Sequence, residues 1–191
     1  MKRNYLSFSP YHLTYAAICL ALAITLPFLA GNIPEVGNML CPMHLPVLLC
    51  GFLCGWKWGT TVGAVAPLLR SFIFARPPLY PTAVAMAFEL AAYGLLAGIL
   101  FQKFPRRIGY TYLSLVVAML GGRAVGGFAQ LALLSLNGKG YTAALFFTDY
   151  FVTSWPGIVI QLLLIPPIVS ALRRANLVPY EKGNEYDRKI V

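Results

Sequence analysis

The chain has few charged residues for its length. Only 11% of its 191 residues are Asp, Glu, Lys or Arg, whereas 59% are hydrophobic and the mean hydropathy is +0.70. A typical soluble domain carries about 25% charged residues, so this chain lacks the charge to cover a water-facing surface. Its content of Phe, Leu, Ile and Val also excludes an intrinsically disordered chain. The composition therefore predicts a protein that uses the lipid bilayer as its solvent.

Acidic residues and histidines are scarce as well, with six Asp and Glu and two His in the whole chain. The sequence contains no HExxH, no Gly-rich phosphate loop, no Ser/His/Asp set and no paired catalytic carboxylates. Cys41, His44, Cys50 and Cys54 raise the question of a metal site. Cys50 and Cys54 lie in an apolar segment, however, where cysteine behaves as a small hydrophobic residue. We therefore expect no metal, no cofactor and no enzymatic activity of the chain's own.

The net charge of +9 would favour nucleic-acid binding in a soluble protein. Here the basic residues lie between apolar runs rather than along one face, and no zinc-finger spacing, RNP-like segment or heptad repeat is present. We expect no nucleic-acid partner.

Apolar runs predict an all-α integral membrane protein with six transmembrane helices. The second and third runs are short for a bilayer, and only residues 56–59 separate them, which is typical of two spans joined by a tight turn. We expect one membrane domain over residues 1–178 and a polar cytoplasmic tail over residues 179–191. The predicted spans are residues 14–30, 43–55, 60–75, 82–102, 112–136 and 152–172.

The distribution of Lys and Arg predicts the orientation. If both termini are cytoplasmic, eleven Lys and Arg residues fall on the cytoplasmic side, only Arg76 and Lys139 fall outside, and Arg70 and Arg123 lie within spans. This asymmetry follows the positive-inside rule and requires an even number of spans. We expect the N-terminal apolar run to be a span rather than a cleaved signal peptide, because no small-residue cleavage site follows it.

Ionisable residues inside a membrane are costly and are functional candidates by default. Arg70 and Glu89 fall toward the outer side of successive spans, where they either form a structural ion pair or contact a ligand. Arg123 needs oxygen atoms around its guanidinium group, and either Asp149 or a ligand supplies them. His44, at the outer start of the second span, either donates to a ligand or caps the helix.

Further polar and aromatic residues are candidates for a ligand pocket. Gln130 lies two helical turns after Arg123 on the same face, and Gln161 is polar within an apolar span. The outer loops contribute Asn38, Tyr80 and Trp155, which either contact a ligand or form an aromatic belt at the membrane surface. Gly122 and Gly126 form a small-xxx-small pair, for which plain helix packing is the favoured interpretation.

Ala17 and Ala21 form an AxxxA pattern in the first span, a small-residue stripe that allows close helix contact. Together with six spans in under 200 residues, and with the sequences of residues 43–52, 63–71 and 81–90, this pattern resembles the substrate-binding S component of energy-coupling factor (ECF) transporters. The resemblance covers about residues 13–177, and the three quoted stretches are similar to the vitamin-type S components of Gram-positive bacteria.

The resemblance implies a high-affinity capture subunit for a small water-soluble vitamin or related micronutrient, in the bacterial plasma membrane. Its partners would be a transmembrane coupling subunit and two ATPase subunits, with Ala17 and Ala21 at the docking face. The pocket implied by the family overlaps Glu89, Arg123, Gln130, Asp149, Trp155, Asn38 and Tyr80, with Arg70 close by. Nickel and cobalt members use a His directly after the initiator Met, whereas this chain has Lys2.

Two other classes stay open at this stage. A stand-alone secondary transporter or channel for a small polar solute would need ion-coupling carboxylates or broken helices, and Glu89, Pro67 and the pair Pro166 and Pro167 are its candidates. A small membrane enzyme is disfavoured by the shortage of acid and base groups.

Overall fold

The computed structural model describes residues 10–29, 39–104, 108–136, 143–175 and 178. The described residues form helices and no strands. The predicted tail over residues 179–191 and the loop containing Asn38 lie outside the described residues. All-helical architecture is what a chain in lipid requires, because a helix satisfies its backbone hydrogen bonds within one segment.

The long helices fall where the apolar runs predict them. They are α1 (Pro10–Leu29), α3 (His44–Cys54), α4 (Trp56–Phe74), α5 (Val84–Lys103), α6 (Ile108–Leu136) and α8 (Trp155–Arg174). Shorter elements are η1 (Leu79–Ala83), α7 (Ala143–Phe147) and η2 (Thr148–Val152).

Four of these helices, α1, α5 (with η1), α6 and α8, are long and apolar enough to cross a membrane. The 11-residue α3 is about 16 Å long, roughly half the hydrocarbon thickness of a bilayer. The described residues therefore establish a multi-pass membrane protein with at least these four candidate spans, and α3 and α4 form the predicted tight hairpin. Gly55 makes this turn with φ 87°, a backbone conformation that glycine adopts without strain.

The prolines inside the helices do not interrupt them. Helix α4 continues through Pro67, and α8 continues through Pro166 and Pro167. Proline is tolerated in membrane helices where neighbouring groups satisfy the freed backbone. The broken helices that would favour a secondary transporter are therefore absent at these described positions.

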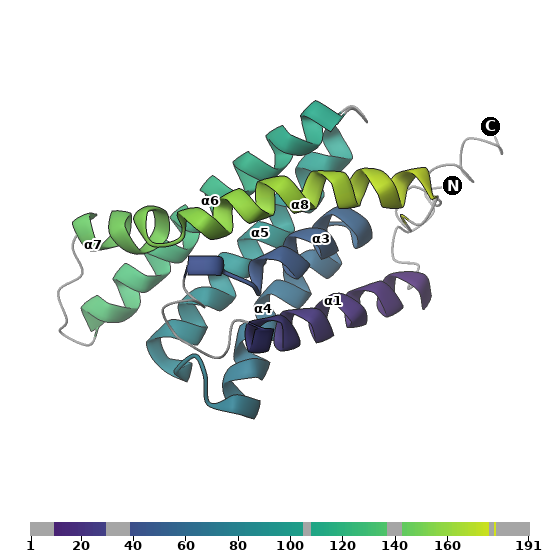
Figure 1. Cartoon of the computed structure of the whole chain (residues 1–191). Coiled ribbons are helices and arrows are strands. Elements are labelled where there is room, and N and C mark those ends of the chain that lie inside the picture. The colour runs from purple at the N-terminus through teal and green to yellow at the C-terminus, as the bar shows by residue number, and fades with distance from the viewer. Residues whose placement is uncertain (1–9, 30–38, 105–107, 137–142, 176–177, 179–191) are drawn as a thin grey trace, which may run out of the picture.

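Helix α5 lies at the centre of the bundle and packs against α3, α4 and α6 (Figure 1). Helix α8 packs on α3 and α6, and α1 packs on α3 and α4. The beginning of α1 and the end of α8 lie at the same end of the bundle, as an even number of crossings requires (Figure 1). We refer to the opposite end, where α1 ends and α3 and α8 begin, as the α1–α3 end.

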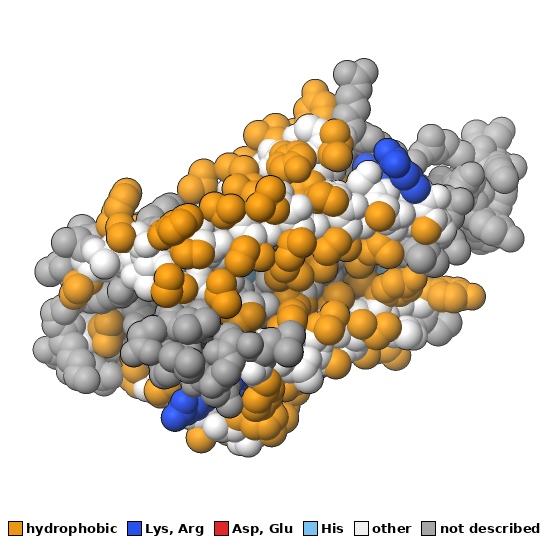
Figure 2. Space-filling view, in the orientation of Figure 1, with side chains coloured by type: hydrophobic (Ala, Val, Ile, Leu, Met, Phe, Trp, Pro, Cys, Tyr) orange, Lys and Arg blue, Asp and Glu red, His pale blue; other side chains and the backbone are white. Residues whose placement is uncertain are grey.

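The surface of the bundle is largely apolar. In Figure 2 hydrophobic side chains cover most of the visible face, and Lys and Arg side chains appear only toward its two ends. Large apolar side chains are exposed on α1, α6 and α8, including Ile18, Phe128 and Leu163. A soluble monomer does not expose apolar surface on this scale, so this surface fits acyl chains.

Candidate functional site

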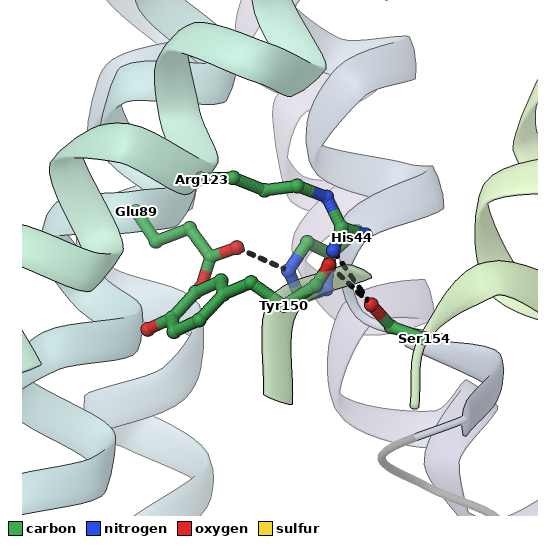
Figure 3. A network of polar contacts seen from close by, with 5 residues as sticks. All are labelled: His44, Glu89, Arg123, Tyr150 and Ser154. Atoms are coloured by element: carbon green, nitrogen blue, oxygen red, sulfur yellow. Dashed lines mark hydrogen bonds and ion pairs between the residues drawn. The ribbon is translucent and has the colours of Figure 1, made fainter. Parts of the chain in front are cut away.

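Polar side chains gather inside the bundle near the α1–α3 end (Figure 3). His44 begins α3, Glu89 lies in the second turn of α5, Arg123 lies in the middle of α6, and Ser154 directly precedes α8. We call these four residues the polar cluster. They come from four separate segments of the sequence and meet because α5 is enclosed by α3 and α6, with α8 packed on both.

Arg123 is the largest fully buried side chain in the described part of the protein, with only 2% of its surface exposed. Its Nη1 donates a hydrogen bond of 2.6 Å to Ser154 Oγ. The Ser154 hydroxyl in turn donates to the Tyr150 carbonyl oxygen at 2.7 Å. A buried charge is stable only when oxygen atoms or opposite charges surround it, and the segment leading into α8 supplies part of this environment.

Glu89 and His44 form the second contact of the cluster. His44 Nε2 lies 3.3 Å from Glu89 Oε1, and each residue is only 4% exposed. The Tyr93 ring packs edge-on against the His44 ring, with 5.2 Å between centroids. Among the described residues, Glu89 therefore contacts His44, on α3, in place of the Arg70 considered from the sequence.

Two glycines of α6 bring Arg123 close to Glu89. An added Cβ at Gly126 would lie 2.8 Å from the Glu89 side chain, and one at Gly122 would lie 2.8 Å from the Tyr93 ring. Glu89 and Tyr93 are one turn apart on α5, so both side chains lie against the glycine face that flanks Arg123. The close-packing interpretation of this small-xxx-small pair is confirmed.

Cys41, in the loop before α3, lies within electrostatic reach of both Glu89 and Arg123. Burial raises the pKa of the Cys41 thiol to about 12; the charge of Glu89 adds to the rise, and Arg123 opposes it. Glu89 and Arg123 therefore lie around the same residue, and a thiol there stays protonated at neutral pH.

Arg70 occupies a separate environment. Its Nη1 lies 3.9 Å from Met43 Sδ, and its guanidinium carbon lies 5.6 Å from the Phe28 ring centroid. Arg70 is also buried, near the end of α4. Since Met43 directly precedes His44, Arg70 lies beside the polar cluster.

The loop candidates are divided by the structure. The Tyr80 hydroxyl donates to the Leu133 carbonyl oxygen at 3.0 Å, which ties η1 to the end of α6. Trp155 is 61% exposed at the start of α8, and Gln130 is half-buried on α6. Asn38 and the side chain of Asp149 lie outside the described residues. A ligand role for these five residues stays a prediction.

Ser154, Tyr93 and the pairing role of His44 were not recognised as parts of one site from the sequence. A hydroxyl residue directly before Trp-Pro at the start of a span was the available signal for Ser154. Tyr93 follows Glu89 by four residues in an otherwise apolar helix, so it was detectable as a neighbour on the same face. Nothing in the sequence placed either of them beside Arg123.

The AxxxA pattern of α1 lies on the outside of the bundle. Ala17 and Ala21 are exposed on α1, whereas Ala16, Cys19 and Ala23 of the same helix are buried. The two alanines thus belong to the face of α1 directed away from α3 and α4. This arrangement leaves a strip of small side chains accessible to another membrane helix.

The architecture defines a class: a multi-pass helical membrane protein with a buried polar cluster near one end of its bundle. The family is given by comparison. The family model "ECF transporter, substrate-specific component" matches residues 12–169, and the chain belongs to this family. It is thus the substrate-binding subunit of an ECF-type importer, a transport subunit rather than a catalyst. No curated protein and no solved structure matches the chain.

Proposed function

We propose that this chain captures a small water-soluble vitamin or related micronutrient with high affinity and delivers it to an ATP-driven importer in the bacterial plasma membrane. The observation that carries the proposal is the polar cluster of His44, Glu89, Arg123 and Ser154, buried in an otherwise apolar bundle. Such groups are expensive in lipid and persist where they serve a substrate pathway. Membership of the ECF family supports the assignment to import.

The chemistry of the cluster favours a polar ligand with oxygen acceptors. The planar guanidinium of Arg123 presents several N–H donors suited to a carboxylate or to carbonyl oxygens. Glu89 and His44 offer an acceptor and a titratable ring on the opposite side of the same cluster. A solute bearing both acceptor and donor groups therefore suits the site better than a purely apolar or a simple cationic one.

The exposed alanines of α1 supply the second half of the function. We propose that Ala17 and Ala21 dock on the transmembrane coupling subunit, which joins two ATPase subunits that energise transport. The proposal is supported by their exposure on a helix whose other face is buried against α3 and α4. The substrate would thus bind at the polar cluster, and the coupling subunit would bind on the outer face of α1.

Ligand retention by the purified protein tests the capture role. Native mass spectrometry should detect a co-purified metabolite on the wild type, and Arg123→Ala should lose it. Lys103→Ala is the matched control, because it removes an exposed positive charge at the far end of α5. Ser154→Ala, a smaller change to the same cluster, should weaken retention if Arg123→Ala fails to fold.

Two results would contradict the proposal. One is a wild-type protein that retains no metabolite and is stabilised by no vitamin in a thermal-shift panel. The other is uptake of the solute by cells that lack the coupling and ATPase subunits, since this result would favour a stand-alone transporter.

A further inference from the structure

Gln161 is a deeply buried polar residue outside the polar cluster. It lies in the second turn of α8 and only 1% of its surface is exposed. Neither its Oε1 nor its Nε2 has a hydrogen-bond partner among the residues that the structure describes. A buried amide with both ends unsatisfied costs free energy, so its presence requires an explanation.

The position of Gln161 points toward the polar cluster. Gln161 follows Ser154 by seven residues, two helical turns, so both lie on one face of α8. Gly157, between them on that face, faces residue Leu40: an added Cβ would lie 2.7 Å from the Leu40 carbonyl oxygen. Gln161 is therefore directed toward the start of α3.

His44 begins α3, the helix toward which Gln161 is directed. It follows Leu40 by four residues, and α3 and α8 run in the same direction and pack together (Figure 1). One atom of His44 is also unsatisfied: Nδ1 is buried and has no hydrogen-bond partner in the described ranges. Its other nitrogen, Nε2, is held by Glu89. A second unused polar atom thus faces the interior from α3.

Tyr93 adds a third atom of the same kind. Its ring packs against the His44 ring, and its buried hydroxyl lies near the Glu89 carboxylate without meeting hydrogen-bond geometry in the described segments. Three helices, α3, α5 and α8, therefore each bring an unsatisfied polar group toward the interior. A ligand that hydrogen-bonds to these groups would remove the free-energy cost of burying them. Without a ligand, each unsatisfied group destabilises the protein.

We propose that Gln161 is a specificity-determining residue of the substrate site, and that the substrate presents to it an uncharged edge with an adjacent donor and acceptor, as in a primary amide, lactam or imide. The inference rests on the proposed capture function and names the chemistry of its ligand. A side-chain amide carries one acceptor and two donors, and it pairs with such an edge through two parallel hydrogen bonds. Arg123 then binds the oxygen-rich part of the same molecule.

Ligand-free stability provides the first test. Full-length protein in detergent, shown by mass spectrometry to carry no small molecule, is compared with Gln161→Met. Because methionine removes an unsatisfied amide at similar length, Tm should rise by about 2–4 °C. Ser114→Ala is the control: the Ser114 hydroxyl already donates to the Tyr110 carbonyl oxygen at 2.8 Å, so its loss should not raise Tm. A fall in Tm for Gln161→Met would show a structural partner for the amide and would overturn the inference.

Ligand binding provides the second test. Riboflavin and biotin, whose imide or ureido edge carries a donor and an acceptor side by side, are compared by isothermal titration with pyridoxine and nicotinate, which carry no such edge. The wild type should bind a member of the first group, and Gln161→Met should weaken that binding by at least about 100-fold, because a site built for hydrogen bonds rejects partners that cannot form them. Tyr93→Phe should weaken it to a smaller degree.

The outcomes separate the two proposals. Equal binding by wild type and Gln161→Met, or wild-type binding of pyridoxine or nicotinate alone, would overturn the role of Gln161 and leave the capture function standing. Failure of the wild type to bind any member of the panel or to retain any metabolite would contradict the capture function, whereas the Tm comparison would still decide whether Gln161 has a structural partner.

Discussion

At the scale of single residues, Arg123 sets the requirements of the interior. A guanidinium group with 2% exposure in an apolar bundle needs compensating oxygen atoms, and Ser154 supplies one of them. Ser154 occupies the residue before α8, but its hydroxyl makes no capping bond to that helix. Its hydrogen bonds instead connect Arg123 to the Tyr150 backbone, so this serine links α6 to the segment that leads into α8.

Removal of the Ser154 hydroxyl is therefore expected to destabilise the protein. Ser154→Ala loses a hydrogen bond to a buried charge, a contribution of about 1.5–3 kcal/mol. Thermal unfolding in detergent should show a lower Tm for Ser154→Ala, and Ser154→Thr, which keeps a hydroxyl, should restore most of it. An unchanged Tm in the alanine variant would mean that Arg123 does not depend on this contact.

Cys41 is expected to alkylate slowly and with an unusual pH dependence. Its pKa is raised to about 12, so the reactive thiolate is depleted at pH 8 and its fraction rises about tenfold for each pH unit. A thiol with a pKa of about 8.5 gains only about threefold between pH 8 and pH 9. The rate of N-ethylmaleimide labelling of Cys41, measured by peptide mass spectrometry with glutathione as reference, checks this difference.

The control for that experiment is Cys41→Ser, which should remove nearly all labelling because Cys19, Cys50 and Cys54 are buried. A threefold rise in the rate of Cys41 labelling would indicate an ordinary thiol and would contradict the raised pKa of this half-buried residue.

At the scale of helices, glycine decides how closely α3, α4 and α5 approach. Gly94 of α5 lies against the Gly59 backbone of α4, and Gly63 of α4 lies against the Leu90 backbone of α5. A Cβ at either position would meet backbone atoms, which cannot move aside as a flexible side chain can. In lipid, where no hydrophobic effect draws helices together, such close backbone contact supplies much of the packing energy.

Gly94→Ala should therefore destabilise the bundle even though alanine has the higher helix propensity. Overpacking of this kind costs about 1–3 kcal/mol, and the measurement is Tm or resistance to unfolding in detergent. Gly109→Ala is the matched control on α6, because no atom lies within 4 Å of an added Cβ there. Equal stability of the two variants would rule out backbone contact at Gly94.

The elements themselves were largely predictable. All six apolar runs correspond to helices. A long apolar segment is predictable from hydropathy alone, because it is removed from water either by lipid or by the packed interior. The ends were less predictable: α1 begins at Pro10 and α6 at Ile108, each four residues before the predicted span. Helix ends depend on local backbone contacts with water or headgroups, and hydropathy does not record these contacts.

At the scale of the whole molecule, the proposed substrate site and the proposed docking face are separate. The polar cluster lies inside the bundle near the α1–α3 end, whereas Ala17 and Ala21 are exposed along the outside of α1. A change on the outer face of α1 should therefore act on partner docking without reaching the substrate.

Ala17→Trp is expected to abolish co-purification with the coupling and ATPase subunits while leaving substrate retention unchanged. The reason is steric: a small-residue strip allows close helix contact, and an indole ring prevents it. Ala124→Trp is the control, since Ala124 is an exposed alanine on α6. Pull-down of the co-expressed complex gives the measurement, and normal assembly by Ala17→Trp would exclude this face as the docking surface.

The sequence by itself determined that the protein lies in a lipid bilayer, where its helices fall, and which ionisable residues lie within them. Each of these follows from local composition: apolar length predicts a span, and an ionisable side chain within a span is conspicuous wherever it lies. Glu89 and Arg123 were therefore recognised from the sequence as ionisable residues within spans, and Ala17 and Ala21 as a small-residue pattern.

Tertiary structure decided which of those residues meet. Whether Glu89 pairs with Arg70 or His44 depends on how α5 rotates between α3 and α4, and the glycines of α4 and α6 fix that rotation through backbone and side-chain contacts. The Ser154 contact with Arg123 and the unsatisfied amide of Gln161 depend in turn on the placement of α8. Such contacts arise between segments distant along the chain, so a pattern of neighbours in sequence does not contain them.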